Sequence, residues 1–570
     1  MKAKRGPLSN VWLLNSSVLF FTLILILRLG DIQLVQGQAY KDKAEKQYTV
    51  ATTGFFDRGS IFFQEKSGRK ISAATVVPDY TLAVDPSLVT DPKGLADKLI
   101  KFATFDRADF IARVTRAGDR YEEVAKHLGE KEIEGIKSLK DKAIILKKDQ
   151  KRFYPGGSAA AQVIGFVGGS ASGLSGRYGL EKYYDETLGR SGNTTSSSFF
   201  ADLFLKAGQT ILSTHAREGD LVTTIEPTVQ GMLERVLRDD VLKKYSALQA
   251  SGIIMNPVTG EIYAMASTPT FDPNNFSKEK NQGVFINPLV EGVYEMGSIM
   301  KPLTMAAGID LGVITANTTY DDKGFVVVNK KRVSNFDGKG RGVVSMQEVL
   351  NQSLNTGTMF VEDRLGNDRF REYFKAFGLG QETGIDLPNE ARGNIVNLDS
   401  PRDIEYKTAS FGQGISTTPI ETIRALASLA NGGVLVTPHV VKSVEYGLGL
   451  THGFVSGDER RVIKKETSRE ISRMLTVVVD KALMAGALKM PRYSIAAKTG
   501  TAQLVEDGAY SKSDYLHTFF GYFPSYDPKF IIFLAVKNPR GEAYASHTLS
   551  EPFMQITKFL LNYYEVPPDR

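Results

Sequence analysis

An almost unbroken apolar run near the start of the chain predicts a membrane anchor. Residues 11–27 read VWLLNSSVLFFTLILIL and follow a short basic segment. A run of this length is at the short end for a helix that crosses a bilayer. Basic residues before such a run place the N-terminus in the cytoplasm and the remainder outside. We therefore expect a cytoplasmic tail over residues 1–9 and a transmembrane anchor over residues 10–28.

Two other interpretations of this run stay open. A cleaved signal peptide is the first, because GQA at residues 37–39 weakly resembles a cleavage site. The second is a buried helix of a soluble domain, but residues 18–27 are apolar nearly throughout, whereas a surface helix shows an apolar stripe. No second run of comparable length follows, so the pattern favours a protein that crosses the membrane once.

The segment after the anchor changes pattern several times. Residues 29–47 are polar with scattered apolar positions, which is typical of a helix leaving a membrane. Short β-like runs separated by glycine, proline and charge fill residues 48–90, and residues 91–150 are predicted to be mostly helical. Residues 191–210 begin rich in serine and threonine and are predicted to be a loop or linker.

Beyond about residue 217 the pattern predicts one antiparallel sheet flanked by helices, and hence an α+β fold. Two apolar runs within 251–268 are joined by a turn rich in Asn, Pro and Gly, which indicates a hairpin. Helical segments dominate from 298 to about 435. Three more strands are expected within 493–539, followed by a closing helix over 549–564.

Composition narrows the possible chemistry. The chain has no cysteine, which excludes a disulfide framework, a thiol nucleophile and a thiolate metal site. Its net charge of +6 is spread over 570 residues, so nucleic acid is not an expected partner. The six histidines show no ligand spacing, and we expect neither a metal nor a cofactor. One of them, His517, precedes a strand and is a candidate to line a cleft.

The segment YEMGSIMKP, residues 294–302, contains a candidate nucleophile and its base. Ser298 and Lys301 are three residues apart, so on a helix they share a face. A serine hydroxyl needs a neighbouring base to take its proton, and a lysine serves if burial or a second cation lowers its pKa. Pro302 suits the first turn of a helix, which Gly312 would end.

Two later segments carry matching chemistry. NQSLNTG provides the hydroxyl of Ser353 and the amide of Asn355. AAKTGTAQ provides Lys498 and the hydroxyls of Thr499 and Thr501 at the end of a β-like run, where Gly500 would let substrate backbone approach closely. One cation and two hydroxyls can hold a carboxylate beside a reacting carbonyl. Other Ser-x-x-Lys pairs, Ser67–Lys70 and Ser277–Lys280, lie in polar stretches that are typical of surface turns.

Together these motifs resemble the signature of penicillin-binding proteins and serine β-lactamases, which is Ser-x-x-Lys, Ser-x-Asn and Lys-Thr-Gly in that order. The chain resembles a class B penicillin-binding protein over most of its length beyond the anchor. FFDRGSIFF at 55–63, RFYPGGSAAAQVIGFVG at 152–168 and GRYGLEKYYDETLGRSG at 176–192 are similar to the motifs of that family's pedestal domain. One departure is EMGSI, where the family commonly has Glu-Pro-Gly-Ser-Thr.

The resemblance implies a domain order and a reaction. We expect an elongated, dimerisation-like pedestal domain over residues 29–215 and a penicillin-binding transpeptidase domain over residues 216–570. The implied activity is that of a serine-type peptidoglycan D,D-transpeptidase. It would cross-link stem peptides through an acyl-enzyme on Ser298.

Residue roles are carried over from the family in the same way. Lys301 would deprotonate Ser298, and the backbone amides of Ser298 and Thr501 would form the oxyanion hole. Ser353 would relay a proton to the leaving D-alanine, and Asn355 would orient Lys301 and the substrate amide. The remaining motif would hold the terminal carboxylate of the substrate through Lys498, Thr499 and Thr501.

Partners and alternatives also follow from the resemblance. The substrate would be a stem peptide ending in D-Ala-D-Ala, and β-lactams would be covalent inhibitors. Single-pass insertion in a bacterial inner membrane would place the catalytic domain outside the cytoplasm, beside a multi-pass peptidoglycan glycosyltransferase and divisome proteins. SLN at 353–355 favours the division type, whereas the elongation type usually has aspartate. A D,D-carboxypeptidase or β-lactamase-like hydrolase, and a non-catalytic membrane scaffold, remain alternatives.

Overall fold

The structure is a computed structural model that describes residue 22 and residues 57–570, except 117–119, 171–172, 191–217, 447–448, 456, 458 and 507–508. The predicted tail, the anchor (apart from residue 22), the helix expected over 29–47 and the linker expected over 191–210 therefore lie outside the described residues. Within the described part, no helix combines the length and the apolar character needed to span a bilayer. The account below concerns the compact unit Asp57–Arg570.

Five antiparallel strands form the central sheet, in the order β18-β19-β20-β8-β9. The strands are β8 (Gln249–Met255), β9 (Ile262–Thr268), β18 (Ala496–Glu506), β19 (Ala509–Phe523) and β20 (Phe530–Lys537). The hairpin predicted within 251–268 is confirmed as β8 and β9, and the three later strands are confirmed as β18 to β20.

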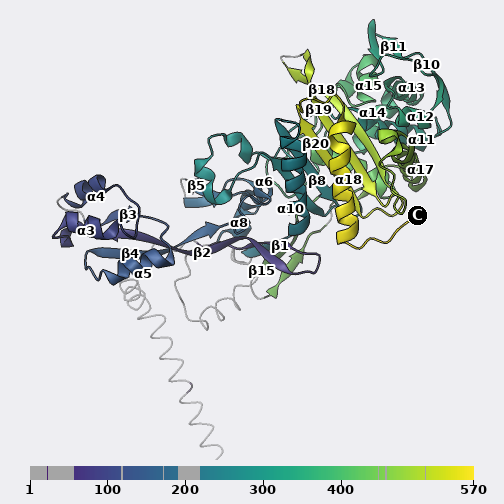
Figure 1. The fold of residues 1–570 in the computed structure, drawn as a ribbon. Helices are drawn as coiled ribbons and strands as arrows, with labels where there is room; N and C mark the ends of the chain where they lie inside the picture. The colour runs from purple at the N-terminus through teal and green to yellow at the C-terminus, as the bar shows by residue number, and fades with distance from the viewer. Residues whose placement is uncertain are drawn as a thin grey trace, which may run out of the picture. The chain divides into compact units, whose positions relative to one another are not determined.

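Helices cover both faces of this sheet. All residues of β20 except the last are buried, which requires protein on either side of the strand. One group of helices that packs on the sheet consists of α10 (Pro227–Arg235), the π-helix η4 (Val236–Lys243) and the closing helix α18 (Ala545–Tyr563). A second group consists of α16 (Pro419–Ala430) and α17 (Lys465–Val477), which pack against each other and against the sheet. Figure 1 shows α18 crossing the strands.

A helical region extends from the second layer. It contains α11 (Lys301–Asp310), α12 (Met346–Asn351), α13 (Asn355–Leu365), α14 (Asn367–Ala376) and α15 (Asp403–Ala409). Two small hairpin-like pairs lie beside it, β10 (Thr319–Asp322) with β13 (Gly342–Ser345) and β11 (Phe325–Val328) with β12 (Lys331–Ser334). Gly312 follows α11 with φ of +77°, so the predicted helix stop is confirmed.

A second sheet joins segments that are far apart in the chain, in the order β16-β15-β7-β1-β2-β3 with β4 also paired to β2. Its strands are β1 (Ile61–Gln64), β2 (Lys70–Val84), β3 (Glu122–Ala125), β4 (Ile144–Phe153), β7 (Gly219–Thr223), β15 (Val441–Tyr446) and β16 (Thr451–Gly453). β7 pairs parallel to β1 and antiparallel to β15. The later part of the chain thus contributes strands to the sheet that begins at residue 61.

The prediction that residues 91–150 are mostly helical is wrong in part. The described residues of this segment form three helices, α3 (Pro92–Leu99), α4 (Arg107–Val114) and α5 (Glu130–Ser138). Residues 144–153, however, form β4, which pairs residue by residue with residues 75–84 of β2. The lysine-rich sequence of β4 looks like a solvated helix face, but pairing with β2 decides its conformation. Helices and strands enclose a separate core that includes Leu82, Phe110 and Ile136.

The remaining small elements connect these parts. They include α6 (Ala161–Ile164), β5 (Val167–Ser170), β6 (Gly173–Gly176), α7 (Gly179–Tyr183), α8 (Asp185–Leu188), β14 (Val434–Leu435) and β17 (Arg460–Arg461). Arg58 and Arg152 both donate to the carboxylate of Glu181, which is fully buried. These three residues come from the three pedestal-like sequence motifs, so one charge cluster joins them.

Candidate active site

The turn that carries Ser298 lies against the edge of the central sheet. It begins at Gly297, whose φ of +63° favours glycine, and continues as a 3₁₀ turn (η7, Gly297–Met300) into α11. This turn packs against β18. Ser298 is half-buried, whereas Lys301 is completely buried. The expected placement of the serine at a helix N-terminus is confirmed, with a 3₁₀ turn in place of the first α-helical turn.

Ser353 lies next to Lys301, as the order of the motifs predicts. It connects α12 to α13 with φ of +55°, a left-handed conformation that is rare for a residue with a side chain. The Nζ atom of Lys301 donates to the carbonyl oxygen of Ser353 at 2.5 Å and to its Oγ at 3.2 Å. A strained backbone conformation thus presents both oxygens of Ser353 to the buried amine of Lys301.

Lys498 reaches the same hydroxyl from the sheet. Its Nζ donates to Ser353 Oγ at 2.9 Å and to the carbonyl oxygen of Thr499 at 2.9 Å, and the residue is only 3% exposed. Two lysines that are almost 200 residues apart in the chain therefore share one serine oxygen. The structure brings the three sequence motifs together at this point.

Burial changes the protonation of both lysines. Loss of solvation lowers the pKa of Lys301 well below its ordinary value, and the nearby charge of Lys498 lowers it further. Burial also lowers the pKa of Lys498, to about 7. Near neutral pH this site therefore holds an amine that is ready to accept a proton, beside a second amine that is close to its own titration midpoint.

The hydrogen bonds of Lys301 differ from the simplest expectation. We expected contact between Ser298 and Lys301, but among the described residues the bonds donated by Lys301 go to Ser353, and none joins it to Ser298. In enzymes without bound substrate, catalytic hydrogen bonds are often long and shorten only in the reacting complex. Ser298 and Lys301 are nevertheless adjacent along one turn, three residues apart.

Asn355 and Gly500 lie at the site, but their local contacts differ from those expected. The amide of Asn355 donates to the carbonyl oxygen of Ser334 at 2.9 Å, so this bond ties β12 to the site and does not orient Lys301. A Cβ atom on Gly500 would lie 2.7 Å from the carbonyl oxygen of Met296 and 2.3 Å from Thr518 Oγ1. The close approach that Gly500 permits is therefore with the protein's own Ser298 turn.

The other residues of the third motif lie on β18 as expected. Thr499 and Thr501 are both half-buried, and the Oγ1 of Thr501 accepts the backbone amide of Ala545 at 3.1 Å. His517, opposite Thr501 on β19, is completely buried and contacts Thr548, so it packs inside the domain and does not line an open cleft. Burial lowers the pKa of His517 to about 4, so its ring is neutral at physiological pH.

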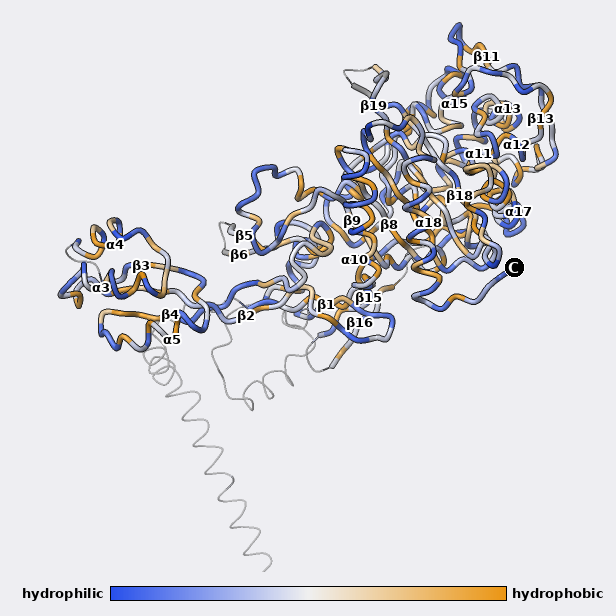
Figure 2. Tube along the Cα trace, in the orientation of Figure 1, coloured by the Kyte–Doolittle hydropathy of each residue, from blue (hydrophilic) through white to orange (hydrophobic). Residues whose placement is uncertain are grey.

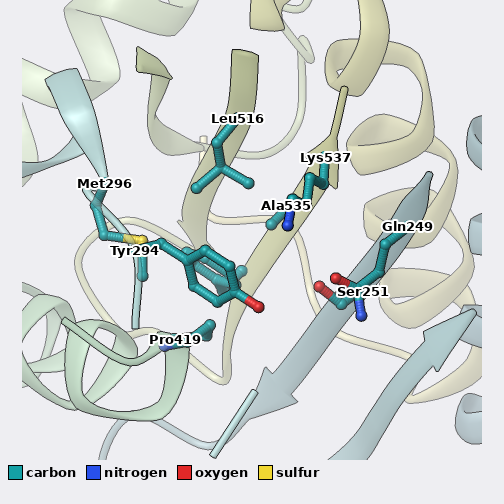
Figure 3. Close-up of a pocket in the computed structure, with 9 residues that line it drawn as sticks. Gln249, Ser251, Tyr294, Met296, Pro419, Leu516, Ala535 and Lys537 are labelled. Atoms are coloured by element: carbon teal, nitrogen blue, oxygen red, sulfur yellow. The ribbon is translucent and has the colours of Figure 1, made fainter. Parts of the chain in front are cut away.

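A small cavity nearby is separate from this cluster. Figure 3 shows that Tyr294 projects into it toward the side of the sheet that carries Gln249 and Ser251. Its lining includes Met296, two residues before Ser298, but none of the three motifs. The described residues also contain no group of three or more side chains suited to bind a metal ion.

Two family models match the chain. The model described as "Penicillin binding protein transpeptidase domain" matches residues 250–558, and the one described as "Penicillin-binding Protein dimerisation domain" matches residues 58–198. The first match alone covers more than half of the chain. The chain belongs to the class B penicillin-binding proteins.

Named relatives agree with this assignment. This penicillin-binding protein is 31% identical over 551 residues to Stage V sporulation protein D of Bacillus subtilis, with 94% of the chain and 83% of the relative covered. It is 26% identical over 526 residues to peptidoglycan D,D-transpeptidase FtsI of Escherichia coli, with 90% of the chain and 84% of the relative covered. The family and its serine-type transpeptidase domain are thereby established.

Solved structures share the fold. Penicillin-binding protein 3 of Mycobacterium tuberculosis, complexed with aztreonam, matches with a TM-score of 0.68 at 23% identity, covering 90% of this chain and 98% of that one. Penicillin-binding protein 2X of Streptococcus thermophilus matches with a TM-score of 0.73 at 21% identity, covering 90% and 80%. At these identities the likeness shows a common two-domain α+β fold.

One part of the site was missed by the sequence analysis. Glu295, three residues before Ser298, accepts the amide of Gly414 at 2.9 Å and the hydroxyl of Tyr510 at 3.1 Å. The loop of Gly414 also contacts the Ser298 turn, because the amide of Gly297 donates to the carbonyl oxygen of Gly412 at 3.1 Å. The glycine-rich run SFGQG was a visible signal, but its partner Glu295 could be found only from the fold.

Proposed function

We propose that this penicillin-binding protein is a peptidoglycan D,D-transpeptidase that cross-links stem peptides through an acyl-enzyme on Ser298. The observation that carries the proposal is the position of Ser353 Oγ between the amines of Lys301 and Lys498, next to the turn of Ser298. A structural role alone does not account for two buried lysines that pair with no carboxylate among the described residues, because burying an uncompensated charge is costly.

In the first step, Ser298 attacks the carbonyl between the two D-alanines. The neutral amine of Lys301 accepts the hydroxyl proton, and the Oγ atom forms a bond to the carbonyl carbon. The peptide C–N bond then breaks, and the leaving D-alanine takes a proton that Lys301 passes on through Ser353 Oγ. An ester between Ser298 and the stem peptide remains.

In the second step, an amine from a neighbouring stem attacks the ester carbonyl. As the new amide C–N bond forms, the ester C–O bond to Ser298 breaks, and the proton that the amine loses passes through Lys301 to Ser298 Oγ. The amides of Ser298 and Thr501 are the proposed donors to the oxyanion in both steps. Asn355 keeps its proposed role toward the substrate amide, with its contact to Ser334 fixing the side chain.

The substrate carboxylate would bind beside the nucleophile. Lys498 supplies the positive charge, and the hydroxyls of Thr499 and Thr501 supply two further donors on the same strand. A charged hydrogen bond of this kind is stronger than a neutral one, so it can position the D-Ala-D-Ala end. β-Lactams, which mimic that end, would acylate Ser298 in the same way.

The cellular role that we propose is cross-linking at the division septum. It rests on the Ser-x-Asn form of the second motif and on relatives named FtsI. Another relative is named for sporulation, and neither of these relatives is named for elongation, so the division role is better supported than the elongation role. Anchoring by residues 10–28 in the inner membrane, and work beside a multi-pass glycosyltransferase and divisome proteins, complete the proposal.

The decisive experiment combines labelling with turnover. Full-length protein is incubated with a labelled penicillin, and Ser298→Ala is expected to lose the covalent band while keeping the melting temperature of the wild type. Equal labelling of both proteins would refute the assignment of Ser298. Slow release of the bound label is expected for a transpeptidase, whereas release within seconds would favour the hydrolase alternative.

A further inference from the structure

A strongly basic segment lies beside the proposed active site. We call residues 323–341 the basic flap; it contains β11 and β12, and Figure 1 shows β11 near α15. The flap has six basic side chains and one acidic side chain, a net charge of +5 in 19 residues. The whole chain of 570 residues has a net charge of +6. Positive charge is therefore concentrated here far beyond the average of the chain.

Most of this charge has no counterion in the described part of the protein. The single acid of the flap, Asp337, pairs with Arg341 at 2.8 Å. The five other basic side chains are exposed, and no described ion pair includes them: Lys323, Lys330, Lys331, Arg332 and Lys339. Like charges held close together repel, so an anion placed among them would be attracted by all of them.

Tertiary contacts hold the flap in place. An isolated two-stranded hairpin is at best marginally stable in water. At the tip of this one, Asn329 Oδ1 accepts the amide of Ile404 at 3.0 Å, and at its base the buried Asn335 donates to Asp322. The flap therefore presents its charges from a fixed position, which reduces the entropy that a ligand would have to remove.

The outer face of the flap combines apolar surface with a cation. In Figure 2 hydrophobic and hydrophilic residues alternate around β11. Val327 is 61% exposed and lies opposite Arg332 in the strand register. The guanidinium group of Arg332 lies 3.8 Å from the centre of the Phe325 ring. Such a face suits a ligand that carries both carboxylates and small apolar groups.

The base of the flap touches the proposed active site. Ser334, the last residue of β12, accepts the amide of Asn355, and the ring of Phe336 lies 6.0 Å from that of Tyr544. Tyr544 precedes Ala545, whose amide donates to Thr501. Because each strand of the hairpin has four residues, its tip is about 13 Å from its base. A polymer that enters the site can therefore reach the flap.

We propose that the basic flap binds the carboxylates of the acceptor peptidoglycan strand. This inference rests on the proposed function, because it assigns the flap to the strand whose amine resolves the acyl-enzyme. Lys498 would hold the terminal carboxylate of the donor stem inside the site. The flap would then be available to bind the carboxylates of other stems. Each uncross-linked stem ends in a carboxylate, and several weak contacts with one polymer add up through their high effective concentration.

The test is charge reversal on the flap with a matched control. Full-length wild type is compared with Lys331→Glu/Lys339→Glu and with Lys93→Glu/Lys131→Glu, which makes the same charge change at exposed lysines of α3 and α5. Binding to purified sacculi is measured by co-sedimentation at low and high salt. Because an exposed ion pair contributes a factor of about 1.4 to 5, the flap variant should bind about tenfold more weakly at low salt. The control variant should bind as the wild type does.

Treated sacculi identify the source of the negative charge. When their carboxylates are converted to amides, wild type and flap variant should bind equally weakly. When their phosphate-containing polymers are extracted, the difference between the two proteins should remain. Equal binding of both proteins to untreated sacculi would overturn the inference and point to a protein partner. A difference that disappears with the phosphate polymers would also overturn it, and would identify those polymers as the ligand.

Failure of the inference can be told from failure of the proposed function. Acylation of Ser298 by labelled penicillin does not involve the polymer, so it reports whether each variant is folded and whether the catalytic assignment holds. Loss of sacculus binding together with normal acylation supports the flap. Wild type that is not acylated would refute the proposed function, whatever the flap variants bind.

Discussion

Replacing Lys498 by methionine should change the pH at which Ser298 becomes acylated. Both Lys301 and Lys498 bond Ser353 Oγ, at 3.2 and 2.9 Å, so their nitrogens are no more than about 6 Å apart. Two positive charges at that distance repel by about 3 kcal/mol at an effective dielectric constant of about 20, which corresponds to about two pKa units. Without Lys498, the pKa of Lys301 should rise, by up to that amount where Lys498 is fully protonated.

The assay is the rate of acylation by a labelled penicillin between pH 5 and pH 10. Acylation requires neutral Lys301, so its acid limb should move toward higher pH in Lys498→Met, by up to about two units. Lys498→Arg keeps a positive charge and serves as the control, with an acid limb near that of the wild type. An acid limb that stays in place in the methionine variant, or moves equally in both variants, would refute this account of how Lys301 is kept neutral.

The free energy of unfolding provides a second test of the Lys498→Met substitution. Burial lowers the pKa of Lys498 from 10.5 to about 7, so between these values the unfolded chain holds a proton that the folded protein lacks. The free energy of unfolding of the wild type therefore rises with pH through this window, and at pH 7 the buried amine costs about 4 kcal/mol. Lys498→Met should be more stable than the wild type at pH 7, and the difference should shrink toward pH 10, as measured by denaturant unfolding.

Three further substitutions test the local geometry. Ser353→Gly should abolish acylation because the shared hydroxyl is lost, and relief of about 1 kcal/mol of backbone strain at φ of +55° should partly offset the lost hydrogen bonds; acylation at the wild-type rate would contradict this. Gly500→Ala should destabilise by about 1–3 kcal/mol, since its Cβ meets the carbonyl oxygen of Met296, and unchanged thermal unfolding would refute the contact. Asn355→Ala should lose the hydrogen bond to Ser334, which should lower the free energy of unfolding by about 1 kcal/mol. Trypsin should then cleave the basic flap faster, and an unchanged cleavage rate would show that this hydrogen bond does not hold the flap in place.

Local sequence was enough to predict much of the transpeptidase domain. The hairpin of β8 and β9, the strands β18 to β20 and the closing helix α18 all show apolar patterns that match their burial. Such elements lie in one well-packed core, where the period of the apolar residues and the position of the turns agree with the final structure. The motif order likewise predicted which three segments would converge.

Local sequence failed where a distant segment decides the conformation. β4 has a lysine-rich sequence that resembles a solvated helix, but β2 offers it a partner along its full length. β15, more than 200 residues after β7, pairs with it because the fold brings their edges together. Pairing energy of this kind depends on a partner that no window of the sequence contains.

The sequence by itself determined which chemical groups are available: one serine nucleophile, two lysines, a second serine and the hydroxyls of β18. Only the tertiary structure decided that Lys301 and Lys498 share Ser353 Oγ, and that Asn355 bonds Ser334. The pKa of a lysine depends on its burial and on the charges around it, and both arise only when the helical layer closes on the sheet. The residues of the site can therefore be identified from the sequence, whereas the protonation states of its lysines depend on the fold.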